Sequence, residues 1–502
     1  MSPKQLHHPE QRHQPPTSRE RQRARAIRRI LSPADTSALL HSVDVTPMPS
    51  EESALGRPAV SDGLYESFAR IDKVPEELFH KLDVKRGLRN ADGSGVLVGL
   101  TTISDVHGYN KVDGKVVPDE GDLIIRGYHI DDLLAGTHGQ GRFGYEEIAY
   151  LLVTGRLPKA DELADFSARI DSRRELPTGY LSLFPRTTES SSIMNVLARS
   201  TLLLYAFDER PDDTSPTHEI DVSLSMLARL PRIAAIAHEA SVAVRDDARL
   251  AVPPVRQGFS MAETVLDVLR GEKGYTREEA MLLDVMLMLH AEHGGGNNST
   301  FTCRVLSSSG TDAYSAYAAA MGSLKGPKHG GANAKVAAMI EDVASHVSRW
   351  DDDDELASYL ERIAHKEAFD RTGLIYGMGH AVYTKSDPRA RLVRRYAGSL
   401  ASQKGLGERF ELIKSIERLA PGIVQEVRGT TKPICANIDL YTGFVYAMLG
   451  IPDDLYTPIF AMARLAGWTA HRMEELYGSG RIIRPAYNSV IERRSYVPID
   501  ER

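Results

Sequence analysis

Residues 276–293 read TREEAMLLDVMLMLHAEH, and this stretch decides the fold class. It opens with a capping box, in which Thr276 and Glu279 each satisfy a backbone N–H of the other at a helix start. From Met281 to Leu289 the segment is apolar on nearly every side, and only Asp284 interrupts it. A helix that lacks a polar face is buried all round. We therefore expect a central helix against which other helices pack.

The chain on either side of this helix extends the pattern. From residue 145 almost to the end it has the character of helices separated by Gly and Pro, as at Asp387-Pro388 and Thr457-Pro458, where a capping residue precedes a first-turn proline. Residues 87–130 instead break into short strand-like pieces, such as 96–103, with a turn at 112–115. The predicted fold class is mainly α, with a small β element near the N-terminus.

Composition limits the classes of function. The 502 residues carry a net charge of −7, which gives nucleic-acid binding no electrostatic support. Cys303 and Cys435 are the only cysteines, so no disulfide framework or CxxC pair exists. That usage fits a reducing compartment, and we expect a cytoplasmic protein. The longest apolar stretch, 281–289, is too short to span a bilayer.

The first 60 residues have a different character from the rest. They are rich in arginine up to about Ile30 and contain no apolar signal-peptide core. We interpret residues 1–60 as a disordered basic tail. A transit peptide is the alternative, although the interleaved Glu, His and Pro residues argue against it.

Two histidine-containing stretches could carry chemistry. In His290-Ala291-Glu292-His293 the histidines share a helix face, but no third metal ligand follows at a recognisable spacing, and both could simply cap the helix C-terminus. In GPKHGGAN, 326–333, Asn333 could cap a helix and place His329 just before its positive end. A neutral imidazole there could donate a hydrogen bond to a carbonyl. A solvent-facing turn is the alternative.

Four further positions combine charge with an apolar setting. Arg389 falls in the first turn after Asp387-Pro388, where it could meet a carboxylate or be a surface arginine. Asp439 starts an apolar helix and is either a cap or a base. Arg464 lies in so apolar a helix that it must be paired or must bind an anion. Arg484 could be an ordinary surface residue. A GxGxxG match at 139–144 follows no strand, so we interpret it as a loop.

Taken in order, these stretches resemble the citrate synthase family from about residue 85 onward. Several independent motifs in one order are far more specific than any one of them. The matching pieces are LIIRGYHIDDLL (123–134), HAEHGGGNNST (290–300), GSLKGPKHGGAN (322–333), GMGHAVYTKSDPRA (377–390), NIDLYTGFVYAMLGIP (437–452), FAMARLAGW (460–468) and RIIRP (481–485).

The resemblance implies a role for each motif residue. Asp439 would remove a proton from the methyl group of acetyl-CoA, while His329 stabilises the enol at the thioester oxygen. His380 would polarise the ketone of oxaloacetate. The carboxylates of oxaloacetate would be held by His293, Arg389, Arg464 and Arg484.

The resemblance also implies an architecture. A large helical domain, 61–329 with 441–502, would carry a smaller helical domain, 330–440, that closes over the substrates. Arg484 would reach in from a neighbouring subunit, so a homodimer is implied. The substrates are oxaloacetate and an acyl-CoA, and no metal or redox cofactor is required.

Two other functions remain open at this point. A 2-methylcitrate synthase would use propionyl-CoA, and one methylene is worth only about 1–3 kcal/mol of discrimination. A non-catalytic helical scaffold of the same fold is the other, since fold alone does not imply function.

Overall fold

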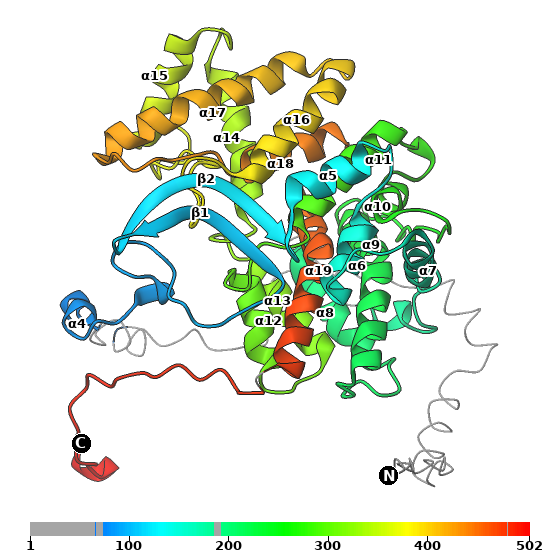
Figure 1. Ribbon diagram of the computed structural model, residues 1–502, viewed down its shortest axis with the longest axis horizontal. Helices are drawn as coiled ribbons and strands as arrows, with labels where there is room; N and C mark the ends of the chain where they lie inside the picture. The colour runs from blue at the N-terminus through cyan, green and yellow to red at the C-terminus, as the bar shows by residue number, and fades with distance from the viewer. Residues whose placement is uncertain (1–65, 67–73, 185–191, 479) are drawn as a thin grey trace, which may run out of the picture.

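The computed structural model describes residue 66 and residues 74–184, 192–478 and 480–502. The tail predicted for residues 1–60 lies outside these residues. Figure 1 shows a body of many helices, a long β-hairpin along one side and a C-terminal segment that leaves the body. The predicted class, mainly α with a small β element, is confirmed.

The β element begins after a short helix, α4 (Glu76–Lys81). Strands β1 (Ser104–Val112) and β2 (Lys115–Ile125) pair antiparallel, and the two-residue β3 (Tyr128–His129) adds a third strand in the order β1-β2-β3. The turn predicted at 112–115 joins β1 to β2. The register shifts between His107 and Tyr109, where residues 119–121 of β2 face only Gly108 of β1, which marks a bulge in β2.

The strand predicted at residues 96–103 is wrong. These residues lie outside the three strands and precede β1. Ile103 is buried in the core, but Leu97 and Leu100 are 84% and 86% exposed, so most of the segment packs against no sheet or core among the described residues. Apolar composition alone does not make a strand where no partner strand is available.

Among the described residues, ten helices make up the larger body, which occupies the lower and right-hand part of Figure 1, and α11 lies among them as the sequence predicts. Its capping box forms, and every side chain from Leu282 to His290 is buried. Buried Asp284 accepts hydrogen bonds from the N–H groups of Gly144 and Tyr145, so the GxGxxG stretch is a loop. The ten are α5 (Ile130–His138), α6 (Tyr145–Thr154), α7 (Ala160–Asp171), α8 (Ile193–Tyr205), α9 (Pro216–Arg245), α10 (Met261–Arg270), α11 (Arg277–His290), α12 (Asn298–Ser307), α13 (Ala313–Leu324) and α19 (Tyr456–Tyr477).

The second long buried helix, α19, packs against α6, α9, α11 and α12. Its first turn contains Thr457 and Pro458, but the N-cap is Leu455, so the cap predicted at Thr457 is wrong. A 3-10 turn at Asp453–Leu455 runs directly into the helix, so the helix starts at Tyr456, before Thr457 could cap it. Arg464 and Trp468 in the middle of α19 are fully buried.

Five helices form the upper part of Figure 1. They are α14 (Ala332–His346), α15 (Asp353–Ala364), α16 (Pro388–Gln403), α17 (Gly407–Arg428) and α18 (Asp439–Met448). Among them α14 packs on α18, α15 on α17, and α16 on both α17 and α18. Asp387 caps α16 through a hydrogen bond from the Arg389 N–H, as predicted.

After α19, residues 480–502 run away from the body as an extended arm with one 3-10 turn, η5 (Ile499–Glu501) (Figure 1). Large apolar side chains on this arm are exposed, including Tyr487 at 91% and Tyr496 at 80%. Of the helices in the described ranges, none combines the length and apolar composition needed to cross a lipid bilayer.

Candidate active site

His290 is the last residue of α11 and His293 lies three residues after it, and the two side chains make different contacts. The His290 Nδ1–H donates to the Met286 carbonyl at 2.7 Å, which satisfies a C-terminal carbonyl of the helix. Burial lowers the pKa of His290 to about 3. His293 is also buried, but its Nε2 lies 3.2 Å from the Tyr383 hydroxyl. The capping interpretation therefore holds for His290 and fails for His293, which faces a different part of the chain.

The loop that carries His380 is held by backbone pairing to the segment before α18. The Gly379 N–H donates to the Cys435 carbonyl at 2.7 Å, and the Asn437 N–H donates to the Gly377 carbonyl at 2.8 Å. Gly377 has a φ of 82°, and a Cβ there would lie 3.0 Å from the Cα of Leu440. A glycine is thus needed for the chain to pass this close to the start of α18.

The tautomer of His380 follows from its hydrogen bonds. The backbone N–H groups of Val382 and Tyr383 donate to His380 Nδ1, at 3.0 and 3.1 Å. Burial lowers the pKa of His380 to about 4, and the charge of Arg389 adds to this effect. A neutral ring whose Nδ1 accepts must carry its proton on Nε2. His380 is therefore a fixed neutral donor through Nε2.

An aromatic cluster joins His293 to His380. The ring centroids of the two histidines lie 5.1 Å apart, nearly perpendicular, and Tyr383 stacks on His380 at 4.7 Å. Burial lowers the pKa of His293 well below its usual value, and the charges of Arg389, His380 and Arg464 lower it further. His293 is thus neutral and lies beside two guanidinium groups.

Arg389 and Asp387 form a buried pair at the start of α16. The Nε and Nη2 groups of Arg389 donate to the two carboxylate oxygens of Asp387, at 3.0 and 2.7 Å. Asp387 also accepts the Ile438 N–H at 3.3 Å. Burial opposes ionisation of Asp387, but Arg389 brings the pKa of that carboxyl below its usual value. The pair fixes the guanidinium and leaves Nη1 outside the fork.

Arg464 is also buried, and the charge of Glu292 acts on it, but no carboxylate of the described residues is hydrogen-bonded to it. Its Nε donates to the His290 carbonyl at 2.6 Å, and its guanidinium lies 4.8 Å above the ring of Phe460. Nη1 and Nη2 are buried with no hydrogen-bond partner among the described residues. Burial lowers the pKa of Arg464 to about 10, so the group is still a cation at neutral pH. A buried cation with free donors indicates an anion-binding site.

His329 lies in the loop before α14, where α12 holds its ring. Its Nε2 is 3.1 Å from Ser299 Oγ and accepts the Ser299 N–H at 3.4 Å. Burial lowers the pKa of His329 to about 4, so the ring is neutral and its proton lies on Nδ1. The Ser299 hydroxyl lies between His329 Nε2 and Asn297 Oδ1, which is 2.9 Å away, and its single proton serves one of them, so the Ser299 N–H is the donor that assigns the tautomer. His329 is thus a second neutral donor, through Nδ1.

The cap predicted for this helix is wrong. The N-cap of α14 is Gly331, and no side chain caps it. Asn333 lies inside the first turn, fully buried, with both side-chain polar atoms unpartnered within the part of the chain that the structure describes. The loop residues 326–331 fold as successive turns, so the helix starts before Asn333 can serve as its cap.

Asp439 occupies the first position of α18, and the N-cap is Ile438. Its carboxylate accepts no hydrogen bond from the described residues, so it does not act as a side-chain cap. Burial raises the pKa of Asp439 to about 6, although the charge of Arg389 opposes this shift. A carboxyl with a pKa close to neutral is suited to act as a general base.

The structure brings six of the seven predicted residues into one electrostatically connected group. Arg389 shifts the pKa of both Asp439 and His380, and Arg464 shifts that of His329 and His293. Arg484 is not among them, because it is exposed on the C-terminal arm. The group offers two neutral imidazole donors, one carboxylate base and two cations, which suits proton transfer on an anionic carbonyl compound.

Three residues that contact this group were not predicted as site residues. Ser299 lies against the ring of His329. Tyr383 contacts both His293 and His380. Asp387 accepts hydrogen bonds from the Nε and Nη2 groups of Arg389. Each lies inside a motif quoted above, which is the signal that could have found them. Their roles depend on contacts made across the fold.

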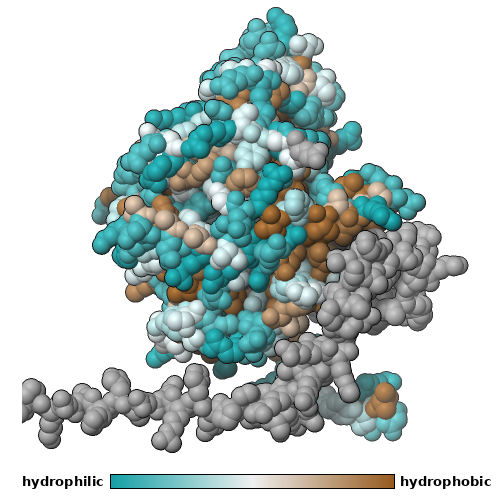
Figure 2. All heavy atoms as spheres, turned by 90° about the vertical axis from the view of Figure 1, so that its right-hand side faces the viewer, coloured by the Kyte–Doolittle hydropathy of each residue, from teal (hydrophilic) through white to brown (hydrophobic). Residues whose placement is uncertain are grey.

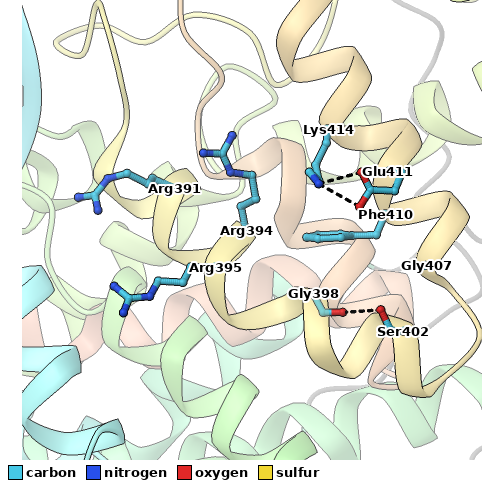
Figure 3. A pocket seen from close by; sticks show the side chains of 9 residues that line it. All are labelled: Arg391, Arg394, Arg395, Gly398, Ser402, Gly407, Phe410, Glu411 and Lys414. Carbon is cyan, nitrogen blue, oxygen red and sulfur yellow. Dashed lines mark hydrogen bonds and ion pairs between the residues drawn. The ribbon is translucent and has the colours of Figure 1, made fainter. Parts of the chain in front are cut away.

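The cleft shown in Figure 3 is a separate feature. Its volume is about 510 Å³, and it lies between α16 and α17. Three arginines line it, but Arg391 pairs with Asp131 and Arg394 with Glu417, and the nearby Lys414 pairs with Glu411. None of the predicted site residues lines this cleft.

Comparison with known proteins gives consistent results. A family model for the C-terminal domain of citrate synthase matches residues 91–486. A citrate synthase of Haloferax volcanii is 34% identical over 425 residues, covering 84% of this chain and 99% of that protein. A 2-methylcitrate synthase 1 of Corynebacterium glutamicum is 32% identical over 423 residues, covering 84% and 98%.

A solved structure agrees with these relatives. It is a citrate synthase of the archaeon Thermoplasma acidophilum in a ternary complex with carboxymethyl coenzyme A and oxaloacetate. It aligns with a TM-score of 0.67 and 25% identity, covering 84% of this chain and 99% of that one. The range matched by the family model includes all seven predicted site residues.

Proposed function

The chain belongs to the citrate synthase family, and from that premise we propose that it condenses acetyl-CoA with oxaloacetate and water to give citrate and CoA. The observation that carries the proposal is Arg464, a fully buried cation with two free Nη groups, whose charge adds to burial in lowering the pKa of two neutral imidazoles, His293 and His329. A small dianion with a ketone is the kind of substrate that such a site accepts.

In this proposal Asp439 is the base. Its carboxylate would remove a proton from the methyl group of acetyl-CoA, and its pKa of about 6 makes it a stronger base than a carboxylate in water. The thioester α-proton is still far less acidic, so the charge that develops on the thioester oxygen must be stabilised. His329 would supply this by donating from Nδ1, the nitrogen left free by Ser299.

On the oxaloacetate side His380 would donate from Nε2 to the ketone oxygen, making the carbon more electrophilic as the enol attacks. Two backbone N–H groups hold Nδ1 as an acceptor, so this donor needs no reorganisation during the reaction. His293, Arg389 and Arg464 would bind the carboxylates. Domain closure by residues 330–440 would exclude water until the carbon–carbon bond forms, and the bound citryl-CoA would then be hydrolysed.

No step of this scheme calls for a metal or a redox group. Proton transfer, enol stabilisation and thioester hydrolysis need only a base, neutral donors and cations, and these are the groups gathered here. We therefore propose that the enzyme uses acyl-CoA as a substrate and has no resident cofactor.

The test is thiol release from acetyl-CoA in the presence of oxaloacetate. Wild-type protein should release CoA thiol, and Asp439→Asn should reduce kcat by at least about a thousandfold because the base is lost. Asp247→Asn, at an exposed position, is the matched control and should keep wild-type activity. A folded wild-type protein without oxaloacetate-dependent thiol release would leave a non-catalytic scaffold of this fold as the better explanation.

The second candidate function is that of a 2-methylcitrate synthase. The chain is 34% identical to a citrate synthase and 32% identical to a 2-methylcitrate synthase, so sequence identity does not separate the two functions. The measurement is the ratio of kcat/KM for acetyl-CoA and propionyl-CoA. A ratio above one supports the citrate synthase proposal. A ratio clearly below one would reassign the enzyme to propionyl-CoA.

We further propose a homodimer in which Arg484 completes the neighbouring site. Arg484 lies on an arm whose apolar side chains are exposed, and Figure 2 shows hydrophobic residues gathered in one area of an otherwise largely hydrophilic face. Exposed apolar side chains gathered in one area are typical of association sites.

Subunit mixing tests this arrangement. Asp439→Asn and Arg484→Ala subunits should each be inactive alone. If Arg484 acts in the partner's site, one intact site forms in each mixed dimer, and random mixing restores about a quarter of wild-type activity. If Arg484 acts within its own subunit, mixing restores nothing.

Two general assignments follow from the same proposal. Cys303 and Cys435 are both free thiols, which supports a cytoplasmic location in a reducing environment. The reaction would place the enzyme in the tricarboxylic acid cycle.

A further inference from the structure

The β1–β2 hairpin contacts two parts of the proposed active site. At its base the Ser104 hydroxyl donates to Glu292 Oε1 at 2.8 Å, and Val106 packs against Gly294, next to His293. Farther along, the hairpin lies against residues 382–386, the loop between His380 and Arg389. Figure 1 shows the hairpin passing between the larger body and the upper helices.

At two positions of the hairpin, the contact with residues 382–386 leaves no room for a side chain. A Cβ on Gly108 would lie 2.6 Å from the Val382 carbonyl oxygen. A Cβ on Gly121, on the other strand, would lie 2.0 Å from the Ser386 carbonyl oxygen. Both values are below any real contact, so each glycine allows one strand to touch the loop backbone directly. The bulge lies in β2, where residues 119–121 face the single residue Gly108 of β1, so both glycines fall where the hairpin meets the loop.

Hydrogen bonds fix the same contact. The buried Thr384 hydroxyl donates to the Gly108 carbonyl at 2.8 Å. The Gly121 N–H donates to Ser386 Oγ at 3.1 Å, and the Ser386 hydroxyl donates to Glu120 at 2.6 Å. Across the hairpin itself, Asp119 accepts from Asn110 at 2.7 Å. The loop is therefore tied to both strands.

This loop sets the geometry of the oxaloacetate side. The N–H groups of Val382 and Tyr383 fix the tautomer of His380, and Asp387, directly after the loop, holds Arg389. The ring of His329 is held by Ser299, and the backbone N–H of Asp439 donates to Asn437, so neither is hydrogen-bonded to residues 382–386. The nearest hydrogen-bonded link to Asp439 is the 3.3 Å contact from the Ile438 N–H to Asp387, which follows the loop. A shift of residues 382–386 would thus displace the ketone donor and one carboxylate ligand before it affected the acyl side.

We propose that the β1–β2 hairpin is a positioning element for oxaloacetate, and that Gly108, Gly121, Thr384 and Ser386 are positioning residues. The proposal rests on the function proposed above. It predicts an asymmetry, because damage to this contact weakens oxaloacetate binding and spares the acyl-CoA.

Thr384 offers the cleanest test, because valine has nearly the same shape. Thr384→Val removes the hydrogen bond to Gly108 and should raise the Kd for oxaloacetate, measured by titration calorimetry, about three- to tenfold, the worth of one hydrogen bond. Thr384→Ser keeps the hydroxyl and should restore binding to within about twofold. The KM for acetyl-CoA should stay at the wild-type value in both.

Gly121→Ala is the stronger perturbation and should raise the Kd for oxaloacetate at least about tenfold, because the loop must move. Gly99→Ala, where a Cβ meets no atom within 4 Å, is its control and should bind like the wild type. Circular dichroism and gel filtration verify that each variant is folded. If Gly121→Ala does not fold, the comparison of Thr384→Val with Thr384→Ser tests the proposal alone.

Two results would overturn the inference. One is a folded Thr384→Val protein with wild-type affinity for oxaloacetate, and the other is an equal rise in KM for both substrates. A wild-type protein that binds no oxaloacetate would instead refute the proposed function, so the two failures can be told apart.

Discussion

The start of α16 and the middle of α19 each bury an arginine, and they treat it in opposite ways. Arg389 is 4% exposed and gives two of its N–H groups to Asp387. Arg464 is fully buried, yet its two Nη groups have no partner in the described chain. The first region has its counter-charge in direct contact. In the second, the charge of Glu292 opposes the lowering of the Arg464 pKa by burial, but Glu292 accepts no hydrogen bond from the Nη groups, which are left for a ligand.

The difference separates stability from binding. A buried ion pair is costly to break from one side, because the remaining charge stays buried and uncompensated. A buried cation without a partner already carries that cost in the folded protein. We therefore expect that Arg389 matters to folding as well as to substrate binding, and that Arg464 matters mainly to substrate binding.

The largest effect should come from Arg389→Met. It leaves the carboxylate of Asp387 buried and unpaired, so the free energy of unfolding should fall by about 3–5 kcal/mol, measured by urea denaturation. The double variant Asp387→Asn with Arg389→Met is the control and should recover most of that loss. If Arg389→Met were as stable as the wild type, the claim that Arg389 contributes to folding would be wrong.

Next in size is Arg464→Met. The affinity for oxaloacetate should fall about 10- to 150-fold, since a hydrogen bond to a charged group is worth about 1.5–3 kcal/mol. The free energy of unfolding should fall by less than about 1 kcal/mol or should rise, because a desolvated charge is removed. Calorimetry and urea denaturation of the same preparation measure both. A loss of stability as large as that of Arg389→Met would contradict the distinction.

The pH dependence of kcat/KM should also distinguish Arg389 from Arg464. Asp439 must be ionised to act as a base, so log kcat/KM should decline as pH falls through about 6, the pKa of its carboxyl. Arg389 lowers the pKa of Asp439, so Arg389→Met should move this midpoint to higher pH. Arg464→Met should leave it in place. A pH–rate profile of the three proteins tests this, and equal shifts in both variants would argue against it.

The smallest effect concerns the ring under Arg464. Phe460→Leu removes the aromatic face that lies 4.8 Å from the guanidinium, a contact worth about 0.5–1 kcal/mol. The affinity for oxaloacetate should fall about two- to fivefold. No change would mean that His290 alone orients Arg464.

The sequence predicted the fold and the site to different depths. The apolar stretch 281–289 identified a buried helix, and the motifs identified six residues that the structure brings into one group. Predictions failed where tertiary contacts decide. Residues 96–103 have strand composition but no partner strand among the described residues, and Asn333 has the chemistry of a cap but lies two positions beyond the N-cap of α14.

By itself, then, the sequence determined the helical class, the buried position of Arg464 and the residue types available for chemistry, because these depend on local spacing and on the cost of burying charge. Only the tertiary structure decided which nitrogen of His329 and His380 carries the proton, which arginine is already paired, and which loop the hairpin touches. The physical reason is that protonation, ion pairing and loop position are set by groups far apart in the chain, such as Ser299 with His329 and Gly108 with Thr384, which meet only when the chain has folded.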